Sequence, residues 1–131
     1  MRQRVADARV ARLATVTPPG APHVVPCCFV LDGDVVYSAV DDVKPKSTLQ
    51  LSRLANVAAN PAAALLVDYY DDDWSQLWWI RLDCEASVLD ASSSDAVAAQ
   101  RLLAAKYEQY AREPPPGAVL ALESERWRAW P

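Results

Sequence analysis

The sequence predicts a mainly β chain with about six antiparallel strands and two or three short helices. Between residues that favour turns, most segments are short and rich in apolar side chains, and the longest of them alternates apolar and polar residues. Only two longer segments repeat apolar residues at helical spacing. Because the strands follow one another through tight turns, the order favours a closed antiparallel architecture over a parallel sheet.

The expected strands are separated by recognisable turns. Pro18, Pro19 and Gly20 form a turn after the first strand. Residues 32–34, Asp-Gly-Asp, suit a tight hairpin turn because glycine tolerates the positive φ that such turns require. The six expected strands span residues 12–17, 23–31, 35–40, 62–70, 77–89 and 118–123.

Residues 77–89 show the cleanest alternation of the chain. Trp78 and Ile80 belong to an apolar face, which we expect to point into the core. Trp79 and Arg81 belong to the opposite face. An outward tryptophan next to an arginine indicates either an interface or the wall of a ligand site.

The expected helices are one within residues 2–11, one that follows Lys44 and ends at Asn60, and one that begins at Ser94 and ends before Pro114. In the second helix, the repeat of Leu51, Leu54, Ala55 and Ala58 predicts the buried face. In the third, we expect Ser94 to be the N-cap and Ala99, Leu102, Leu103, Tyr107 and Tyr110 to form the buried face.

Length and charge limit the possible classes of protein. With 131 residues, the chain is expected to form one domain over residues 1–131, because this length supports one hydrophobic core. The net charge of −4 leaves no general basic face, so neither nucleic acid nor an anionic membrane is an expected partner. No apolar run approaches the roughly 20 residues of a membrane-spanning helix.

Cysteine usage and the N-terminal residues indicate a cytoplasmic location. Residues 1–10 contain no apolar stretch of the kind found in secretory signals. The three cysteines are Cys27, Cys28 and Cys84, and the adjacent pair would point to opposite faces of one strand. A disulfide framework is therefore not expected, and a reducing compartment fits the sequence better.

The chain lacks most catalytic and metal-binding patterns. A single histidine, His23, excludes a multi-histidine metal site, and no Cys-x-x-Cys spacing occurs, so we expect no metal. With only three glycines, neither the Rossmann nor the P-loop fingerprint is present. If the chain is an enzyme, a bound organic cofactor must supply the difficult chemical step.

The segment from Lys44 to Thr48, Lys-Pro-Lys-Ser-Thr, is the best candidate for an anion site. It combines two ammonium groups and two hydroxyls with the start of a helix, where free N–H groups and the helix dipole favour negative charge. The same residues also suit a simple helix cap with solvated lysines. The residues alone leave both interpretations open.

The order of these segments resembles a known family. The stretches "RVARLATVTPPGAPHVVPCCFVLDGDVVYSAVD" and "KPKSTLQLSRLANVAANPAAALLVDYYDDDWSQLWWIRLDCEASVL" resemble the pyridoxamine 5′-phosphate oxidase-like split-barrel proteins. The closer resemblance, which includes the closing "RWRAW", is to the actinobacterial branch that uses the deazaflavin coenzyme F420. The resemblance implies a six-stranded antiparallel split β-barrel and a homodimer with two equivalent cofactor sites in grooves at the subunit interface.

The resemblance also implies which residues hold the cofactor. The segment that grips the cofactor phosphate matches Lys44, Lys46, Ser47 and Thr48. The strand that lines the isoalloxazine-like ring matches Val25, Pro26 and Cys27, and the strand beside it matches Ser38, Ala39 and Val40. Positions that the partner subunit contributes match Trp79 and Arg81. No side chain is assigned a catalytic role.

The function implied is oxidoreduction, in which coenzyme F420 exchanges a hydride with a small organic substrate. The flavin-using oxidases carry an arginine-rich element before the phosphate turn, which this sequence lacks, so coenzyme F420 is preferred over FMN. The alternatives are an FMN-binding oxidoreductase on the same fold, and a protein without catalytic activity that binds a flavin, a deazaflavin or haem.

Overall fold

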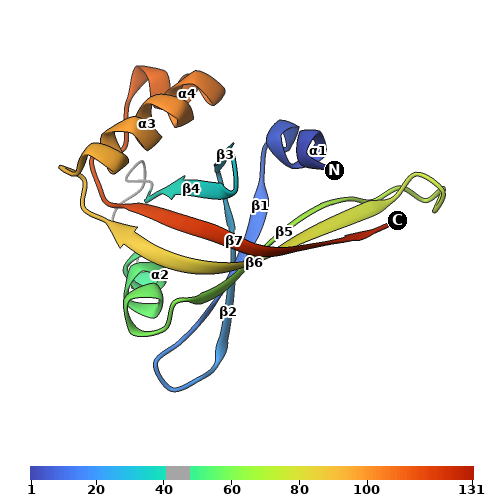
Figure 1. Cartoon of the computed structure of the whole chain (residues 1–131), viewed down its shortest axis with the longest axis horizontal. Coiled ribbons are helices and arrows are strands. Elements are labelled where there is room, and N and C mark those ends of the chain that lie inside the picture. The colour runs from blue at the N-terminus through green and yellow to red at the C-terminus, as the bar shows by residue number, and fades with distance from the viewer. Residues whose placement is uncertain (41–47) are drawn as a thin grey trace.

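The computed structural model of the chain describes residues 1–40 and 48–131, which form one seven-stranded antiparallel sheet and four helices (Figure 1). The strands are β1 (Ala11–Val16), β2 (Pro22–Cys27), β3 (Val30–Asp32), β4 (Val35–Ala39), β5 (Ala62–Tyr69), β6 (Trp78–Leu89) and β7 (Val119–Trp130). The helices are α1 (Arg2–Asp7), α2 (Thr48–Ala59), α3 (Ser94–Lys106) and α4 (Glu108–Arg112). The predicted mainly β, antiparallel class is confirmed. The predicted numbers, six strands and two or three helices, are smaller than the seven strands and four helices of the structure.

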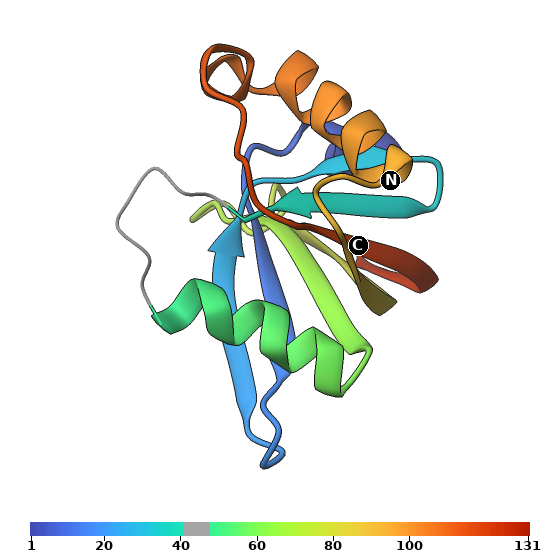
Figure 2. The ribbon, with the colours of Figure 1, turned by 90° about the vertical axis from the view of Figure 1, so that its left-hand side faces the viewer.

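The additional strand arises because the expected strand 23–31 is interrupted at Cys28 and Phe29. The order across the sheet is β2-β1-β5-β6-β7-β4-β3, so β2 and β3 lie at its two opposite edges. Only two residues connect these edges along the chain. The sheet must therefore curl until its edges approach each other, and α2 lies across the resulting curved surface (Figure 2).

A buried tyrosine hydroxyl satisfies the backbone at this interruption. The Tyr107 hydroxyl accepts a hydrogen bond from the Phe29 N–H at 3.1 Å. It also lies 3.0 Å from two carbonyl oxygens to which it can donate, those of Phe29 and Arg9. Phe29 is fully buried, so without this hydroxyl its N–H and C=O would lose their partner away from water.

The buried face of α2 differs from the expected one. Leu54 packs against the core as expected, but Ala55 and Ala58 are exposed. Asn56 and Val57 are buried instead, and the Asn56 amide donates to the Thr15 hydroxyl at 3.1 Å. The helix is therefore rotated from the orientation that the apolar repeat predicts. In this orientation the buried Asn56 amide reaches a hydrogen-bond partner, which a buried amide requires.

The third expected helix is two helices. Its N-cap is Ser93, one residue before the expected Ser94, and the Ser93 hydroxyl accepts from the Ala96 N–H at 3.1 Å. The chain leaves helical geometry at Tyr107, where α3 ends and α4 begins. The expected apolar residues of both helices are buried except Leu102, which is 37 % exposed. In the described part of the chain, no helix has the length and apolar character needed to cross a membrane.

The last strand continues beyond its expected end at residue 123. β7 pairs with β6 as far as the contact between Trp130 and Trp79. Asp83 pairs with Arg126 and Cys84 with Ser124, so Glu125 is the additional residue of a β-bulge. Residues 126–131, expected to be a tail after the last strand, continue β7 as far as Trp130, and Trp127 is partly buried.

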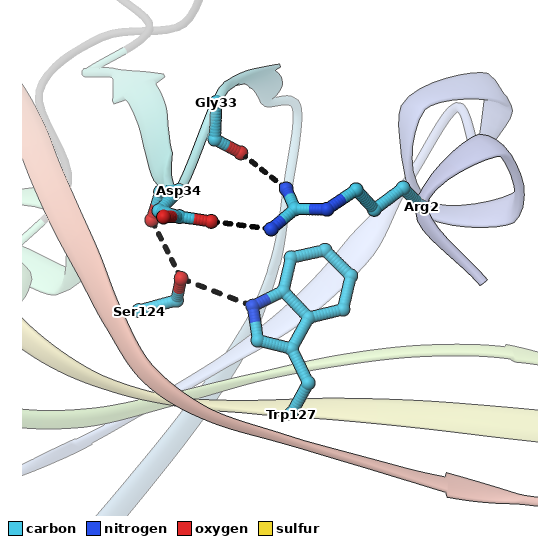
Figure 3. Close-up of polar contacts among 5 residues, drawn as sticks. All are labelled: Arg2, Gly33, Asp34, Ser124 and Trp127. Atoms are coloured by element: carbon cyan, nitrogen blue, oxygen red, sulfur yellow. Dashed lines mark hydrogen bonds and ion pairs between the residues drawn. The ribbon is translucent and has the colours of Figure 1, made fainter.

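A polar cluster fastens α1 to the β3–β4 turn and to β7 (Figure 3). The Arg2 guanidinium donates to the Gly33 carbonyl at 2.7 Å and pairs with the Asp34 carboxylate. It also lies 4.9 Å from the centre of the Trp127 ring, whose indole N–H donates to the Ser124 hydroxyl. Trp127 packs against the core, so its role within one chain is to cover the barrel.

We expect Tyr107→Phe to lower the free energy of unfolding by about 2 kcal/mol, because it leaves buried backbone groups of Phe29 without a partner. Urea unfolding measures this change. The matched control is Tyr70→Phe, at a side chain that is 67 % exposed, where we expect a change within about 0.5 kcal/mol. Equal effects of the two substitutions would show that the hydroxyl does not stabilise the interruption.

Candidate functional site

A pocket of about 250 Å³ lies where β2 and β4 end, and we call it the β2/β4 pocket. Its lining residues are Val10, Pro26, Cys27, Cys28, Ala39, Arg53 and Tyr110. Three of the residues predicted to line a cofactor ring, Pro26, Cys27 and Ala39, are therefore brought together although they come from two strands. The lining is mostly apolar, with one guanidinium, two thiols and one phenol.

The other predicted ring residues lie beside this pocket rather than in its lining. Val25 packs against the core. Ser38 is fully buried, and its hydroxyl donates to the Cys28 carbonyl at 2.8 Å, which ties β4 to the end of β2. Val40 is anchored through its N–H to the Ala118 carbonyl at 3.3 Å.

Arg53 is the lining residue that the sequence analysis missed. It lies on α2, and its Nε atom is buried without a hydrogen-bond partner among the described residues. A buried guanidinium donor without a partner is costly, so such a group indicates a place for an anionic or accepting ligand. Its position beside Leu54 in an apolar helical repeat gave no signal in the sequence, because the pocket arises only when α2 meets β2.

The segment predicted to bind phosphate is only partly described. Lys44, Lys46 and Ser47 lie outside the described residues, and Thr48 is the first residue of α2. Along the chain, this segment connects Val40, which follows β4, with the helix that carries Arg53. Its role in phosphate binding stays a prediction.

The predicted residues Trp79 and Arg81 lie elsewhere on the same chain. They line a shallow groove of about 480 Å³ on the outer face of the sheet, the outer-face groove. Its lining residues are Arg12, Ala14, Val24, Ala64, Leu66, Asp68, Trp79 and Arg81. The outer-face groove shares no lining residue with the β2/β4 pocket, so one chain alone does not unite the two predicted groups.

The predicted alternation of the two tryptophans is confirmed. Trp78 packs against the core, with the Arg4 guanidinium 4.8 Å from its ring centre. Trp79 lines the outer-face groove. The charged residues at the edges of this groove form ion pairs, Arg12 with Asp68 at 3.7 Å and Arg81 with Asp83 at 2.9 Å.

The Cys27 thiol, one of the two in the pocket lining, is unsuited to act as a nucleophile. Burial raises the pKa of Cys27 to about 11, although the Ser38 hydroxyl and the Arg53 charge favour the thiolate. At neutral pH this thiol therefore stays protonated, and a nucleophilic role would require the thiolate.

A half-buried lysine lies near the same thiols. The Lys106 ammonium is 3.9 Å from the centre of the Phe29 ring and 5.3 Å from that of Tyr107. Its nitrogen is buried and has no hydrogen-bond partner among the described residues. Burial, and then repulsion from Arg9, lowers the pKa of Lys106 to about 8.

A curled antiparallel sheet whose opposite edges are joined by two residues is a split β-barrel. The family model described as pyridoxamine 5′-phosphate oxidase matches residues 1–131. The chain therefore belongs to this family. Among curated proteins, no relative matches it.

Several solved structures share the fold. The haem storage protein HutZ of Vibrio cholerae has a TM-score of 0.75 at 14 % identity, with 98 % of this chain and 89 % of that chain covered. An FAD-binding protein of Mesorhizobium loti has a TM-score of 0.74 at 16 % identity, with the same coverage. A haem-binding protein of Mycobacterium smegmatis has a TM-score of 0.76 at 20 % identity, covering 98 % of this chain and 51 % of that chain. At identities this low, the structural similarity shows a shared fold and nothing further.

Because folding lowers the pKa of Lys106, we expect the free energy of unfolding to rise with pH. Its pKa falls from 10.5 to about 8 on folding, so between these values the unfolded chain binds more protons at this amine than the folded chain. The free energy of unfolding should therefore increase as the pH rises from 7.5 to 9.5. We expect Lys106→Met to remove about 1 kcal/mol of this increase, a value reduced for solvent screening of the amine.

Urea unfolding of both proteins at the two pH values checks this expectation. The difference between wild type and variant isolates Lys106, because Cys27, the thiol whose pKa Lys106 lowers, still has a pKa of about 11 in the folded chain and stays protonated over this pH range. If the free energy of unfolding changed equally with pH in both proteins, the lowered pKa of Lys106 would be contradicted.

Proposed function

We propose that the chain binds coenzyme F420 in the β2/β4 pocket, as a homodimer, and catalyses hydride exchange between this cofactor and a small organic substrate. The observation that carries the proposal is the Arg53 Nε atom, which lies in the pocket lining and is buried without a hydrogen-bond partner among the described residues. Family membership supports the same type of site.

The pocket's residues fit both parts of a phosphate-bearing ring cofactor. A phosphate needs cations and oriented donors, which Arg53 offers and which Lys44, Lys46, Ser47 and Thr48 would extend. A planar ring needs an apolar wall, which Pro26, Ala39 and Tyr110 offer. β2 pairs only with β1 among the described strands, so its outer edge leaves backbone N–H and C=O groups for ring heteroatoms.

The chain's own contribution to the reaction is binding, orientation and exclusion of water. Bound coenzyme F420 supplies a hydride donor or acceptor. Arg53 and the Lys44–Thr48 segment would fix its phosphate, and the wall of the pocket would fix the plane of its ring. With a protonated thiol at Cys27 and no catalytic histidine in the lining, we assign no proton transfer to a side chain of the described pocket.

The partner copy would cover the outer-face groove. This groove exposes an apolar surface across four strands, including Val24, which is 62 % exposed. Trp79 adds an aromatic side chain, and aromatic residues are enriched at protein–protein interfaces. A second copy would bury Val24 and Trp79, and it would place residues of one chain beside the pocket of the other.

FMN and haem are the alternative ligands. An FAD-binding protein shares this fold, as do proteins that store or bind haem, so the same fold accommodates each ligand class. In those cases the chain could act as a binding protein without catalysis.

Fluorescence titration with coenzyme F420, beside FMN, haem and a buffer blank, tests the ligand. We expect saturable micromolar binding of coenzyme F420 and weaker binding of FMN. Arg53→Ala should raise the dissociation constant about tenfold or more, the loss of ~1.4 kcal/mol or more from one charge-assisted contact. Lys46→Ala should weaken binding in the same direction.

The matched control is Arg101→Ala, at an exposed arginine of α3 that lies outside the β2/β4 pocket. Its dissociation constant should equal that of the wild type. Preferred binding of FMN or haem would replace the proposed cofactor, and equal affinities of the Arg53 and Arg101 variants would remove Arg53 from the site.

Sedimentation analysis tests the homodimer. Val24→Glu places a charge in the outer-face groove at an already exposed position, so it should convert dimers to monomers and leave the fold intact. Val97→Glu, at a position of α3 that is 42 % exposed, is the control and should stay dimeric. A Val24→Glu protein that sediments like the wild type would show that the interface lies elsewhere.

A further inference from the structure

The outward face of β6 and β7, strands that lie side by side (Figure 1), carries a regular series of cross-strand pairs, which we call the β6–β7 ladder. Its members, in order along β6, are the directly opposite pairs Trp79–Trp130, Arg81–Arg128, Asp83–Arg126, Glu85–Glu123 and Ser87–Ala121. Trp79 and Arg81 line the outer-face groove, and alternation along the strand places the other β6 members on the same face. Residues directly opposite each other share a face, so the β7 members point outward as well.

Two of these pairs bring like charges together. Arg81 lies directly opposite Arg128. Glu85 lies directly opposite Glu123, further along the same two strands. Arg81 forms an ion pair with Asp83 at 2.9 Å. Among the described residues, Arg128, Glu85 and Glu123 form no ion pair, and all three are exposed. Like charges directly opposite each other destabilise a sheet, so opposite charges supplied from outside the chain would stabilise this one.

The β6–β7 ladder is complementary in charge to a second copy of itself. A two-fold axis that lies between two facing sheets, and crosses the strands at the level of the Asp83–Arg126 pair, reverses the order of the ladder in the partner. Arg81 and Glu85 are each two residues from Asp83, on opposite sides of it. Arg81 of one copy would therefore face Glu85 of the partner subunit, and the β7 members of the two like-charge pairs would face each other in the same way.

The two ends of the ladder are complementary in size. The same axis brings the Trp79–Trp130 pair of one copy to the Ser87–Ala121 pair of the partner subunit. Two large rings would then cover two small side chains, and aromatic residues are enriched at interfaces. Trp130 is 48 % exposed in the single chain, so this contact would remove apolar surface from water.

We propose that two copies of this chain associate face to face through the β6–β7 ladder, with the arginine pair of each copy against the glutamate pair of the other. The inference rests on the homodimer proposed above and specifies its contact surface and its orientation. The outer-face groove is continuous with the ladder, because Trp79 and Arg81 belong to both. At a net charge of −4 two copies repel each other overall, so an ordered arrangement of opposite charges is what would orient them.

Sedimentation analysis of charge-reversed variants tests this interface. Arg128→Glu would place a carboxylate against the partner's Glu123, and Glu123→Arg would place a guanidinium against the partner's Arg128. We expect each substitution alone to raise the dissociation constant of the dimer about tenfold or more, because the two-fold axis repeats the like-charge contact twice. The chain with both substitutions exchanges the two charges and should regain the wild-type constant.

The variants are expected to fold. Both positions are exposed, and each single substitution turns a like-charge pair within the chain into a pair of opposite charges. Circular dichroism checks the fold of each variant. The matched control is Glu113→Arg, which reverses the charge of an exposed residue outside the ladder and should leave the dissociation constant unchanged.

A folded Arg128→Glu protein that dimerises like the wild type would overturn the inference, as would a double variant that dimerises as weakly as the single variants. If Val24→Glu still dissociated the dimer in the first case, the homodimer would stand and only the ladder contact would fail. A monomeric wild type would overturn both the homodimer and the ladder contact. Neither Arg128 nor Glu123 lines the β2/β4 pocket, so titration with coenzyme F420 tests the ligand separately.

Discussion

The interruption at Cys28 and Phe29 is the constraint on which the rest of the structure depends. The chain there passes from one edge of the sheet to the other within two residues. The Tyr107 hydroxyl there replaces the ladder partners that Phe29 gives up. The curvature of the sheet follows from this short connection, and the break between α3 and α4 lies at the tyrosine that satisfies it.

The same interruption determines the chemistry of the candidate site. It turns Cys28 toward the lining that Cys27 and Pro26 share, and it brings the end of β4 close through the bond from Ser38. The helix α2 then adds a guanidinium to a surface otherwise made of thiols, a phenol and apolar groups. The lining of the candidate site and the closure of the barrel thus depend on one short segment.

Sequence patterns correctly predicted those features that depend only on neighbouring residues in the chain. The alternation in β6 placed Trp78 and Trp79 correctly because it depends only on the pleat of one strand. The break at Phe29 depends on a residue 78 positions away, and the orientation of α2 depends on a bond between Asn56 and Thr15, 41 positions apart. These contacts leave no signature in the residues that they alter, so the extra strand and Arg53 could not be predicted. The prediction that Lys44, Lys46 and Ser47 hold a phosphate concerns residues outside the described part of the chain.

The position of β7 has a consequence for how the chain acquires its structure. β7 follows the other described strands in sequence, yet it lies between β6 and β4, and among the described strands it alone pairs with both halves of the sheet. During synthesis, β2-β1-β5-β6 and the β3–β4 hairpin can each form, but no strand pairing joins β6 to β4 until β7 has left the ribosome. Each half then presents an unpaired edge, the state in which strands associate with those of other molecules. The barrel is thus assembled by its final segment, and the interval before that segment arrives is when the growing chain most needs protection from aggregation.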